Sequence, residues 1–260
     1  MRVVVIIPAR YASSRYPGKP LVALKGRDGV SKPLVQRSWD CARHFCDAGD
    51  IYVATDDQRI ADYVKGFGGQ VMMTSETCEN GTERCAEAAA KLADPASLVI
   101  NLQGDAPLTP HWFLSDLAAA MRANPTFQMA TPVLRCDAQT YRHFRADRAA
   151  GRVGGTTAVF GADRQALYFS KEVVPYLPDG PLPEPCPVFH HVGVYAYRPS
   201  ALQDYASWPA GPLERHEGLE QLRFLERGVP VLCVEVDARG QLFWELNNPV
   251  DVARIESVLP

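Results

Sequence analysis

The chain begins with a short apolar strand that meets a proline and leads into a basic loop. Residues 3–7 are all β-branched, and Pro8 follows them. Such a run is typical of a parallel strand covered on both faces, and proline lacks the amide that the next ladder hydrogen bond needs. In open α/β sheets, ligands bind where the connections leave the carboxyl ends of the strands. The sequence therefore predicts a ligand-binding loop directly after this strand.

This loop combines three positive charges with small side chains. Arg10, Arg15 and Lys19 lie within ten residues, with no acidic residue among them. Such charges repel one another unless they share an anion, so the loop favours a polyphosphate ligand. The small residues that let backbone amides approach such a ligand are Ala12, Ser13 and Ser14. From charge alone, a solvated basic loop is the alternative.

The composition restricts the class of protein. The 260 residues carry a net charge of −3, so no overall field draws the chain to nucleic acid or to an anionic membrane. The longest apolar stretches have only five to six residues, so we expect no membrane span and no export signal. Seven cysteines without a Cys-x-x-Cys pair predict reduced thiols in a cytoplasmic protein. A zinc site near Cys186, His190 and His191 would lack its second pair of ligands.

Strand-like and helix-like segments alternate along the chain. We expect strands at 3–7, 51–54, 70–74, 98–101, 128–132, 156–160 and 231–236, and helices at 33–48, 58–67, 81–92, 110–124 and 249–259. This alternation predicts parallel βαβ units in an α/β, three-layer fold with a mostly parallel central sheet. The regularity weakens over 133–210, where prolines crowd 175–187, and strand-like sequence resumes at 191–197. We expect a single domain over residues 1–260.

A second candidate site follows the strand near residue 100. The segment 101–107 reads NLQGDAP, which places Gln103 and Asp105 directly after an apolar strand. Mg²⁺ prefers one or two carboxylates together with phosphate oxygens. Glycine, aspartate and proline are also turn residues, so an ordinary turn is the alternative. Combined with the basic loop, the segment favours Asp105 as a magnesium ligand.

A third segment, NGTER at 80–84, opens a predicted helix. The hydroxyl of Thr82 is suited to the helix start, and Arg84 is long enough to reach a base or a phosphate. Another pair of polar residues, Asp56 and Asp57, precedes the helix expected at 58–67 and is suited to cap it.

Together these segments resemble the sugar-acid cytidylyltransferases, above all the CMP-Kdo synthetase (3-deoxy-manno-octulosonate cytidylyltransferase) family. Residues 8–21, PARYASSRYPGKPL, resemble its N-terminal signature; 80–84 resemble Ser-Gly-Thr-Glu-Arg, and 103–107 resemble Gln-Gly-Asp-Glu-Pro, with Ala106 for the glutamate. The resemblance implies a Rossmann-like nucleotidyltransferase that moves CMP from CTP to an anionic acceptor such as Kdo and releases pyrophosphate. It also implies a Mg²⁺ cofactor and a homodimer, with 133–210 contributing to acceptor binding and dimerisation.

The resemblance extends to the acceptor side. Residues 168–171 resemble Tyr-Phe-Ser-Arg with lysine in the last place, 191–198 resemble His-Leu-Gly-Ile-Tyr-Gly-Tyr-Arg, and 212–223 resemble the helix that follows. The acceptor-binding residues implied are Lys171, His191, Tyr195, Glu217, Glu220 and Gln221, with Gln103. The spacing of Glu217, Glu220 and Gln221 predicts a shared helix face, for which a solvated face is the alternative.

The same resemblance assigns the donor side. Arg10, Arg15 and Lys19 would neutralise the triphosphate, and Asp105 would hold Mg²⁺. The remaining nucleotide-binding residues implied are Ala9, Ala12, Ser13, Ser14, Asn80, Thr82, Arg84 and Gln103.

The chain departs from the family pattern near its C-terminal end. Asn247 stands where the family has an aspartate that supplies a second carboxylate to magnesium. If residues 243–247 are extended, Glu245 faces the same side as Asn247 and could supply that carboxylate instead. A further departure lies at 152–159. Two alternatives follow: a cytidylyltransferase for another acceptor (a different sugar acid, an amino-Kdo or a small phosphonate), or a nucleotide-binding protein without turnover.

Overall fold

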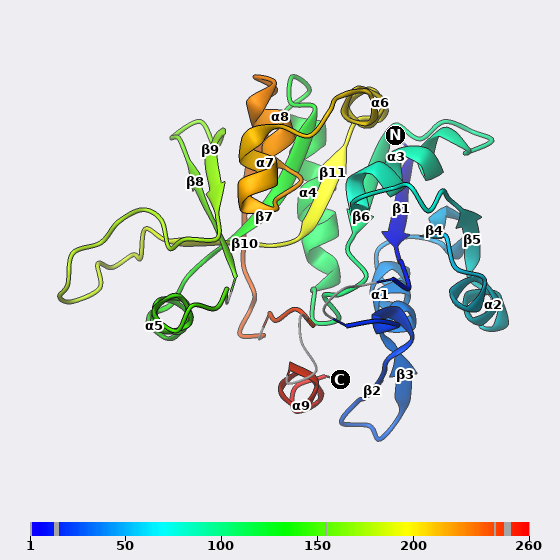
Figure 1. Ribbon diagram of the computed structural model, residues 1–260, viewed down its shortest axis with the longest axis horizontal. Helices are drawn as coiled ribbons and strands as arrows, with labels where there is room; N and C mark the ends of the chain where they lie inside the picture. The colour runs from blue at the N-terminus through cyan, green and yellow to red at the C-terminus, as the bar shows by residue number, and fades with distance from the viewer. Residues whose placement is uncertain (1, 13–15, 154, 242, 247–250, 260) are drawn as a thin grey trace.

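The computed structural model describes residues 2–12, 16–153, 155–241, 243–246 and 251–259 (Figure 1). Arg15 and Asn247, and the serines at 13 and 14, therefore lie outside the described residues. The strands of the main sheet are β1 (Val3–Pro8), β4 (Ile51–Thr55), β5 (Gln70–Met73), β6 (Leu98–Leu102), β7 (Met129–Arg135), β8 (Thr156–Phe160), β9 (Ala166–Ser170), β10 (Phe189–His191), β11 (Val194–Tyr197) and β12 (Val231–Val236). A small separate sheet pairs β2 (Ala23–Lys25) with β3 (Ser31–Pro33).

The order of the main sheet is β5-β4-β1-β6-β11-β7-β10-β8-β9, and β12 also pairs with β7. Strands β5, β4, β1 and β6 are parallel neighbours. Both β6 and β7 pair antiparallel with β11, so they run in the same direction, and β12 is parallel to β7. The expected α/β fold with a mostly parallel sheet is confirmed.

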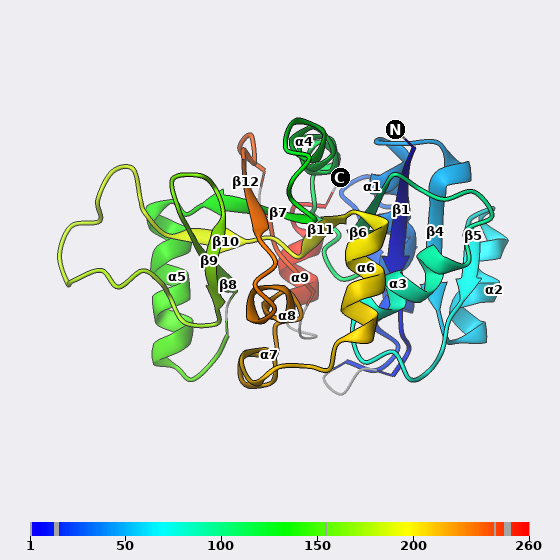
Figure 2. The ribbon, with the colours of Figure 1, turned by 90° about the horizontal axis from the view of Figure 1, so that it is seen from above.

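Helices cover both faces of this sheet (Figure 2). One face is covered by α1 (Leu34–Arg43), α2 (Gln58–Gly66) and α4 (His111–Ala123), and the other by α3 (Gly81–Ala90), α6 (Pro199–Ser207) and α8 (Leu222–Glu226). The remaining helices described are α5 (Ala138–Ala149), α7 (Pro212–Glu217) and α9 (Asp251–Glu256), with short 3₁₀ turns η1 (Lys19–Leu21) and η2 (Ala48–Asp50).

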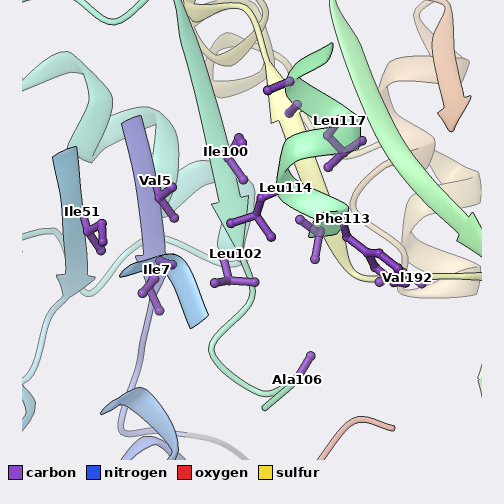
Figure 3. Close-up of a cluster of buried hydrophobic side chains, with 14 of the residues drawn as sticks. Val5, Ile7, Ile51, Ile100, Leu102, Ala106, Phe113, Leu114, Leu117 and Val192 are labelled. Atoms are coloured by element: carbon purple, nitrogen blue, oxygen red, sulfur yellow. The ribbon is translucent and has the colours of Figure 1, made fainter. Parts of the chain in front are cut away.

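The first strand is buried on both faces, as its β-branched run predicts. Val5 and Ile7 belong to the core beneath α1 and α4, whereas Val4 and Ile6 belong to the core beneath α3. Figure 3 shows side chains of α4, including Phe113, directed toward the sheet. The strand ends at Pro8, so the loop that follows starts at the carboxyl edge of the sheet.

Strands β10 and β11 are consecutive in the chain and pair with different ends of β7. Strand β11 pairs with β6, and β10 pairs with β8, so the carboxyl end of β6 and the start of β8 are both brought to the junction at 192–193. In the pairing register, Val194 lies opposite Leu102, and His191 lies opposite Thr156. The junction at 192–193 therefore lies at the carboxyl edge, where ligands bind in open α/β sheets.

The sequence predicted neither α5 nor α6 nor β9. Helix α5 buries only Phe144, so its apolar pattern is too sparse to identify. Its start is fixed by Asp137, whose carboxylate accepts a hydrogen bond from the Thr140 amide at 2.7 Å. The proline-rich stretch after β9 contains no helix or strand over 171–188 (Figure 1). Its Leu177 packs against the buried cluster that includes Phe144 of α5.

Candidate active site

The loops at the carboxyl edge enclose a cavity of about 570 Å³, called the site cavity here. The sequence-predicted residues among those that line it are Ala9, Arg10, Lys19, Asn80, Arg84, Gln103, Asp105, His191, Tyr195, Glu220, Gln221 and Glu245. Ala12, Thr82, Lys171 and Glu217 do not line it. Segments far apart in sequence thus meet beside the junction between β10 and β11.

Lys19 and Asp105 form an ion pair in this cavity. The Lys19 Nζ atom lies 2.8 Å from Asp105 Oδ2 and also donates a hydrogen bond to the Leu246 carbonyl at 3.1 Å. The Leu246 amide in turn donates to the Asp105 carbonyl at 2.8 Å. The basic loop, the loop after β6 and the C-terminal segment therefore hold one another in place. Both side chains are partly buried, which strengthens the pair relative to a surface one.

The glycine before Asp105 allows this loop to approach the end of β1. A Cβ atom on Gly104 would lie 3.1 Å from the Pro8 carbonyl oxygen, which is closer than most Cβ contacts. The loop after β6 thus crosses directly over the end of β1, and Asp105 lies beside the basic loop. Arg10, on the same loop as Lys19, donates a 3.4 Å hydrogen bond to the Glu79 carbonyl across the cavity.

The start of α3 differs from the prediction in its capping residue. Asn80 is the N-cap and accepts a hydrogen bond from the Glu83 amide at 2.9 Å. Thr82 lies inside the helix, and its hydroxyl lies 2.7 Å from the Tyr197 hydroxyl in the core. Its position in the first turn directs the side chain into the sheet, so the expected role of the Thr82 hydroxyl at the helix start is wrong.

Arg84 lines the site cavity, and it is already engaged by protein groups. Its guanidinium lies 2.9 Å from Asp56 and donates to the Thr74 hydroxyl at 2.5 Å, with the side chain only 3% exposed. Asp56 therefore pairs with this arginine, and Asp57 alone caps α2 by accepting from the Arg59 amide at 2.9 Å. The capping role expected for Asp56 is wrong because the buried guanidinium is its partner.

Glu220 joins the donor side of the cavity to its acceptor side. Its carboxylate accepts hydrogen bonds from the Thr82 amide and from Gln103 Nε2, both at 2.8 Å. Burial raises the pKa of Glu220 to about 6, although the hydrogen bonds from Thr82 oppose the rise. The carboxylate orients Gln103, which lies two residues before Asp105.

The predicted shared helix face of Glu217, Glu220 and Gln221 is wrong. Helix α7 ends at Glu217, because Gly218 adopts a left-handed conformation with φ of 61°, and α8 begins only at Leu222. The three side chains consequently have different partners. Glu217 accepts hydrogen bonds from Ser170 Oγ at 2.7 Å and from the Lys171 amide at 2.9 Å, outside the cavity lining.

Lys171 approaches the cavity at Gly218 without lining it. A Cβ atom on Gly218, a lining residue, would lie 2.9 Å from Lys171 Nζ. The lining also includes Arg215, which the sequence analysis did not identify. Two cationic side chains thus lie at this part of the cavity. The signal for Arg215 was its position in the matched segment 212–223, between Glu214 and Glu217.

His191, Tyr195 and Gln221 form a buried wall of the cavity. His191 Nε2 lies 3.0 Å from the Thr131 hydroxyl, and burial lowers the pKa of His191 to about 3, so its imidazole is neutral at pH 7. The Tyr195 hydroxyl donates to Gln221 Oε1 at 3.2 Å. The Gln221 Nε2 atom is buried and has no partner among the described residues. This amide is enclosed within the wall, and Gln221 is only 1% exposed.

Glu245 reaches the cavity that Asp105 lines. A Cβ atom on Gly193 would lie 3.3 Å from Glu245 Oε1, and both residues line the cavity. The predicted orientation of Glu245 relative to Asn247 falls partly outside the described residues. Two carboxylates at one cavity fit the oxygen ligands that Mg²⁺ prefers. Within the described residues, no group of three or more histidine, cysteine, aspartate or glutamate side chains is arranged to hold a metal ion.

Comparison with known proteins assigns this chain to a known family. A model of the cytidylyltransferase family matches residues 4–231. This range spans the basic loop, Asp105 and the turn at 218–221 between α7 and α8, called the Glu220 turn. The chain belongs to the cytidylyltransferases. This cytidylyltransferase is 42% identical over 261 residues to the 3-deoxy-manno-octulosonate cytidylyltransferase of Maricaulis maris, an alignment that covers 100% of this chain and 97% of that protein.

Other relatives agree with this membership. The mitochondrial 3-deoxy-manno-octulosonate cytidylyltransferase of Arabidopsis thaliana is 37% identical, and the alignment covers 99% of this chain and 83% of that protein. A solved structure of a CMP:2-keto-3-deoxy-manno-octonic acid synthetase complexed with CTP superposes with a TM-score of 0.82 at 32% identity, covering 99% of this cytidylyltransferase and 98% of that chain. Among the described residues, no helix is long and apolar enough to span a membrane.

Proposed function

We propose that this cytidylyltransferase transfers CMP from CTP to 3-deoxy-manno-octulosonate (Kdo) and releases pyrophosphate. The observation that carries the proposal is the Lys19–Asp105 pair, 2.8 Å apart. It lies in a cavity that is also lined by the polar residues Gln103, Glu220 and Gln221. The names of the full-length relatives and the CTP-bound neighbour support the choice of donor and acceptor.

In this proposal the donor side neutralises charge. Lys19 and Arg10 line the cavity and would bind the triphosphate of CTP, and Lys19 would stabilise the charge that grows on the departing pyrophosphate. Arg15 remains assigned to the same task, although it lies outside the described residues. Both reactants are anions, so positioning and charge neutralisation account for most of the catalysis.

The acceptor side positions the sugar acid. Gln103 and Gln221 line this part of the cavity, and Glu220 fixes Gln103 by a 2.8 Å hydrogen bond to its Nε2, which leaves the Gln103 amide oxygen for an acceptor hydroxyl. Lys171 and Arg215 bring positive charge to the acceptor carboxylate. The acceptor hydroxyl at its anomeric carbon would then attack the α-phosphorus of CTP in line.

We also propose Mg²⁺ as the cofactor. Asp105 and Glu245 would hold it, and Glu245 would compensate for the neutral Asn247. When bound, the cation supplies positive charge to the phosphate oxygens. Lys19 would release the Asp105 carboxylate when it binds the triphosphate. The carboxylate would then be available to Mg²⁺.

A homodimer is part of the proposal. Apolar side chains are exposed on β9 and on the proline-rich stretch beside it: Leu167 is 64% exposed and Tyr176 is 83% exposed. Exposed apolar side chains of this size are candidates for contact with a partner. A second copy of the chain is the partner that the family resemblance implies.

Pyrophosphate release from CTP tests the reaction. With Mg²⁺ and Kdo, the wild-type protein should release pyrophosphate, and Lys19→Ala should lower kcat/KM by at least about 100-fold. Lys65→Ala, which removes an exposed lysine of α2, is the matched control and should leave the rate unchanged.

The acceptor is tested separately in the same assay. Release with amino-Kdo, another sugar acid or a small phosphonate, but not with Kdo, would reassign the acceptor. Tight CTP binding without release under every acceptor would identify a protein without turnover.

A further inference from the structure

Tyr11 and Gly18 meet where the basic loop closes, and this contact is called the neck of the loop here. The Gly18 amide donates a hydrogen bond to the Tyr11 carbonyl at 2.9 Å. A Cβ atom on Gly18 would lie 3.1 Å from Tyr11 Cζ, so the backbone of Gly18 packs against the ring. The neck therefore depends on the side chain of Tyr11 as well as on its carbonyl.

Two cationic residues of the site cavity flank the neck. Arg10 directly precedes Tyr11, and Lys19 directly follows Gly18. Both cations line the cavity, whereas Tyr11 and Gly18 do not. Lys19 is also held by its pair with Asp105, but Arg10 is exposed and makes a long hydrogen bond of 3.4 Å to the next segment. Ordering a loop costs conformational entropy, so contacts at the neck offset part of that cost before a ligand binds.

Helix α2 supplies a third member of this contact. The guanidinium carbon of Arg59 lies 3.4 Å from the centroid of the Tyr11 ring, within the range of a cation–π contact. Strands β1 and β4 are parallel neighbours, and the Ala9 amide still donates to the Ala54 carbonyl at 2.9 Å beyond the end of β1. The segments that follow the two strands therefore lie side by side. Arg59 does not line the site cavity, so it contacts the loop from outside.

Asp57 holds the guanidinium of Arg59 in place. Its two carboxylate oxygens accept from Arg59 Nε at 3.0 Å and from an Nη atom at 2.6 Å. A pair with two parallel hydrogen bonds fixes the plane of the guanidinium as well as its position. The edge of the guanidinium is thus bound to Asp57, and its face is presented to the Tyr11 ring.

We propose that Arg59 is a positioning residue for CTP, which stacks on Tyr11 and so holds Arg10 and Lys19 in the arrangement that binds the triphosphate. The inference rests on the proposed function, in which those two cations bind the triphosphate. It adds a residue that lies outside the cavity and outside every segment that resembles a family motif. The stack orders the loop in advance, so less of the loop has to be ordered when CTP binds.

Calorimetry with CTP and Mg²⁺, without an acceptor, tests the role of Arg59. An apparent dissociation constant rises as the fraction of protein in the binding arrangement falls. Arg59→Gln should therefore raise the dissociation constant of CTP about two- to fivefold, the range that an exposed cation–π contact gives. Arg43→Gln, which removes an exposed arginine 5.7 Å from the Trp39 ring on α1, is the matched control and should leave the constant unchanged. An unchanged constant in Arg59→Gln would overturn the proposal.

A double-mutant cycle separates positioning from direct binding of a phosphate by Arg59. Tyr11→Phe keeps the ring and should leave the CTP constant unchanged, whereas Tyr11→Leu should raise it about two- to fivefold. Because Arg59 acts through the ring, Arg59→Gln should have almost no further effect in the Tyr11→Leu protein. A full effect of Arg59→Gln in that protein would show direct phosphate binding and overturn the positioning role. A rise in Tyr11→Phe equal to that in Tyr11→Leu would also overturn it.

Kinetics and unfolding distinguish this role from a general loss of structure. The ordered loop is the same once CTP is bound, so Arg59→Gln should raise KM for CTP and leave both kcat and KM for Kdo unchanged. Its urea midpoint should match that of the wild type. A lowered midpoint together with equal changes in KM for both substrates would overturn the inference.

The calorimetry also separates this inference from the proposed function. Absence of CTP binding by the wild type would overturn both. Binding of CTP by the wild type, with the same dissociation constant in Arg59→Gln, would overturn the inference alone.

Discussion

At the scale of single residues, the acidic side chains that the sequence assigned to the site have different surroundings. Asp105 pairs with Lys19, Glu217 accepts from the Ser170 hydroxyl, and Glu220 anchors Gln103. Glu245 lines the cavity beside Gly193. These differences in partner explain why the carboxylates are not interchangeable, although sequence spacing alone groups several of them.

Glu245→Gln should make the enzyme need a higher concentration of Mg²⁺. Loss of one of two carboxylates should raise the Mg²⁺ concentration that gives half-maximal rate about tenfold. The measurement is a Mg²⁺ titration of pyrophosphate release at fixed CTP. Glu76→Gln, at an exposed position before α3, is the control. An unchanged Mg²⁺ dependence in Glu245→Gln would rule out this residue as a ligand.

Glu220 should make the free energy of unfolding depend on pH between its unfolded and folded pKa values. Burial raises its pKa from 4.5 to about 6, so the folded state binds the proton more tightly than the unfolded state. The contribution of this group to stability is therefore largest below pH 4.5 and falls by about 2 kcal/mol as the pH rises through about 6.

Urea unfolding of the wild type and Glu220→Gln at several pH values measures this dependence. The variant cannot titrate at this position, so the difference in unfolding free energy between the two proteins should change by about 2 kcal/mol across the window. A constant difference from pH 4 to 7 would show that the pKa of Glu220 is ordinary.

At the scale of elements, the break between α7 and α8 separates the acceptor-side residues. Gly218→Ala should lower the free energy of unfolding by about 1 kcal/mol because alanine is strained at a φ of 61°. Its Cβ would also meet Lys171 Nζ, so we expect a severalfold higher KM for Kdo.

Gly228→Ala provides the matched control for this substitution. Gly228 follows α8 with a φ of 70°, and a Cβ there would meet nothing within 4 Å. It should cost similar stability and leave KM unchanged. Equal KM values in the two variants would show that the contact between Gly218 and Lys171 has no role in acceptor binding.

Much of the element pattern could be predicted from the sequence. The strand at 3–7 and the helix at 110–124 carry strong apolar patterns, and both were found close to the expected bounds. Helix α5, with one buried residue, gives no such pattern, and α7 stops at Gly218 although the charged spacing continues. Local patterns do not record these tertiary features.

The sequence predicted those site residues that lie within recognised motifs. Asp105 and Lys19 were identified because each follows a strand or lies in the signature loop. The partners of Thr82 and Arg84 were not, because Tyr197 and Asp56 approach from other elements. Side-chain direction in a packed core depends on contacts between segments that no single motif contains.

At the scale of the whole molecule, the proline-rich stretch and β9 lie at one end, away from α2 (Figure 1). We expect light scattering to give twice the chain mass of 28.6 kDa. Tyr176→Asp, which places a charge on an 83% exposed aromatic residue, should shift the mass toward the monomer. A monomeric mass for the wild type at all concentrations would remove the dimer from the account.

The whole fold brings the basic loop, Asp105 and the Glu220 turn to one cavity, and the central claim is that CMP passes from CTP to Kdo there. Phosphorus NMR of CTP, Mg²⁺, Kdo and the protein tests this claim directly. We predict that the triphosphate signals are replaced by pyrophosphate and one phosphodiester signal, and that with Lys19→Ala both form at least about 100-fold more slowly. Pyrophosphate without a phosphodiester, or intact CTP beside a protein that binds it, would contradict the claim.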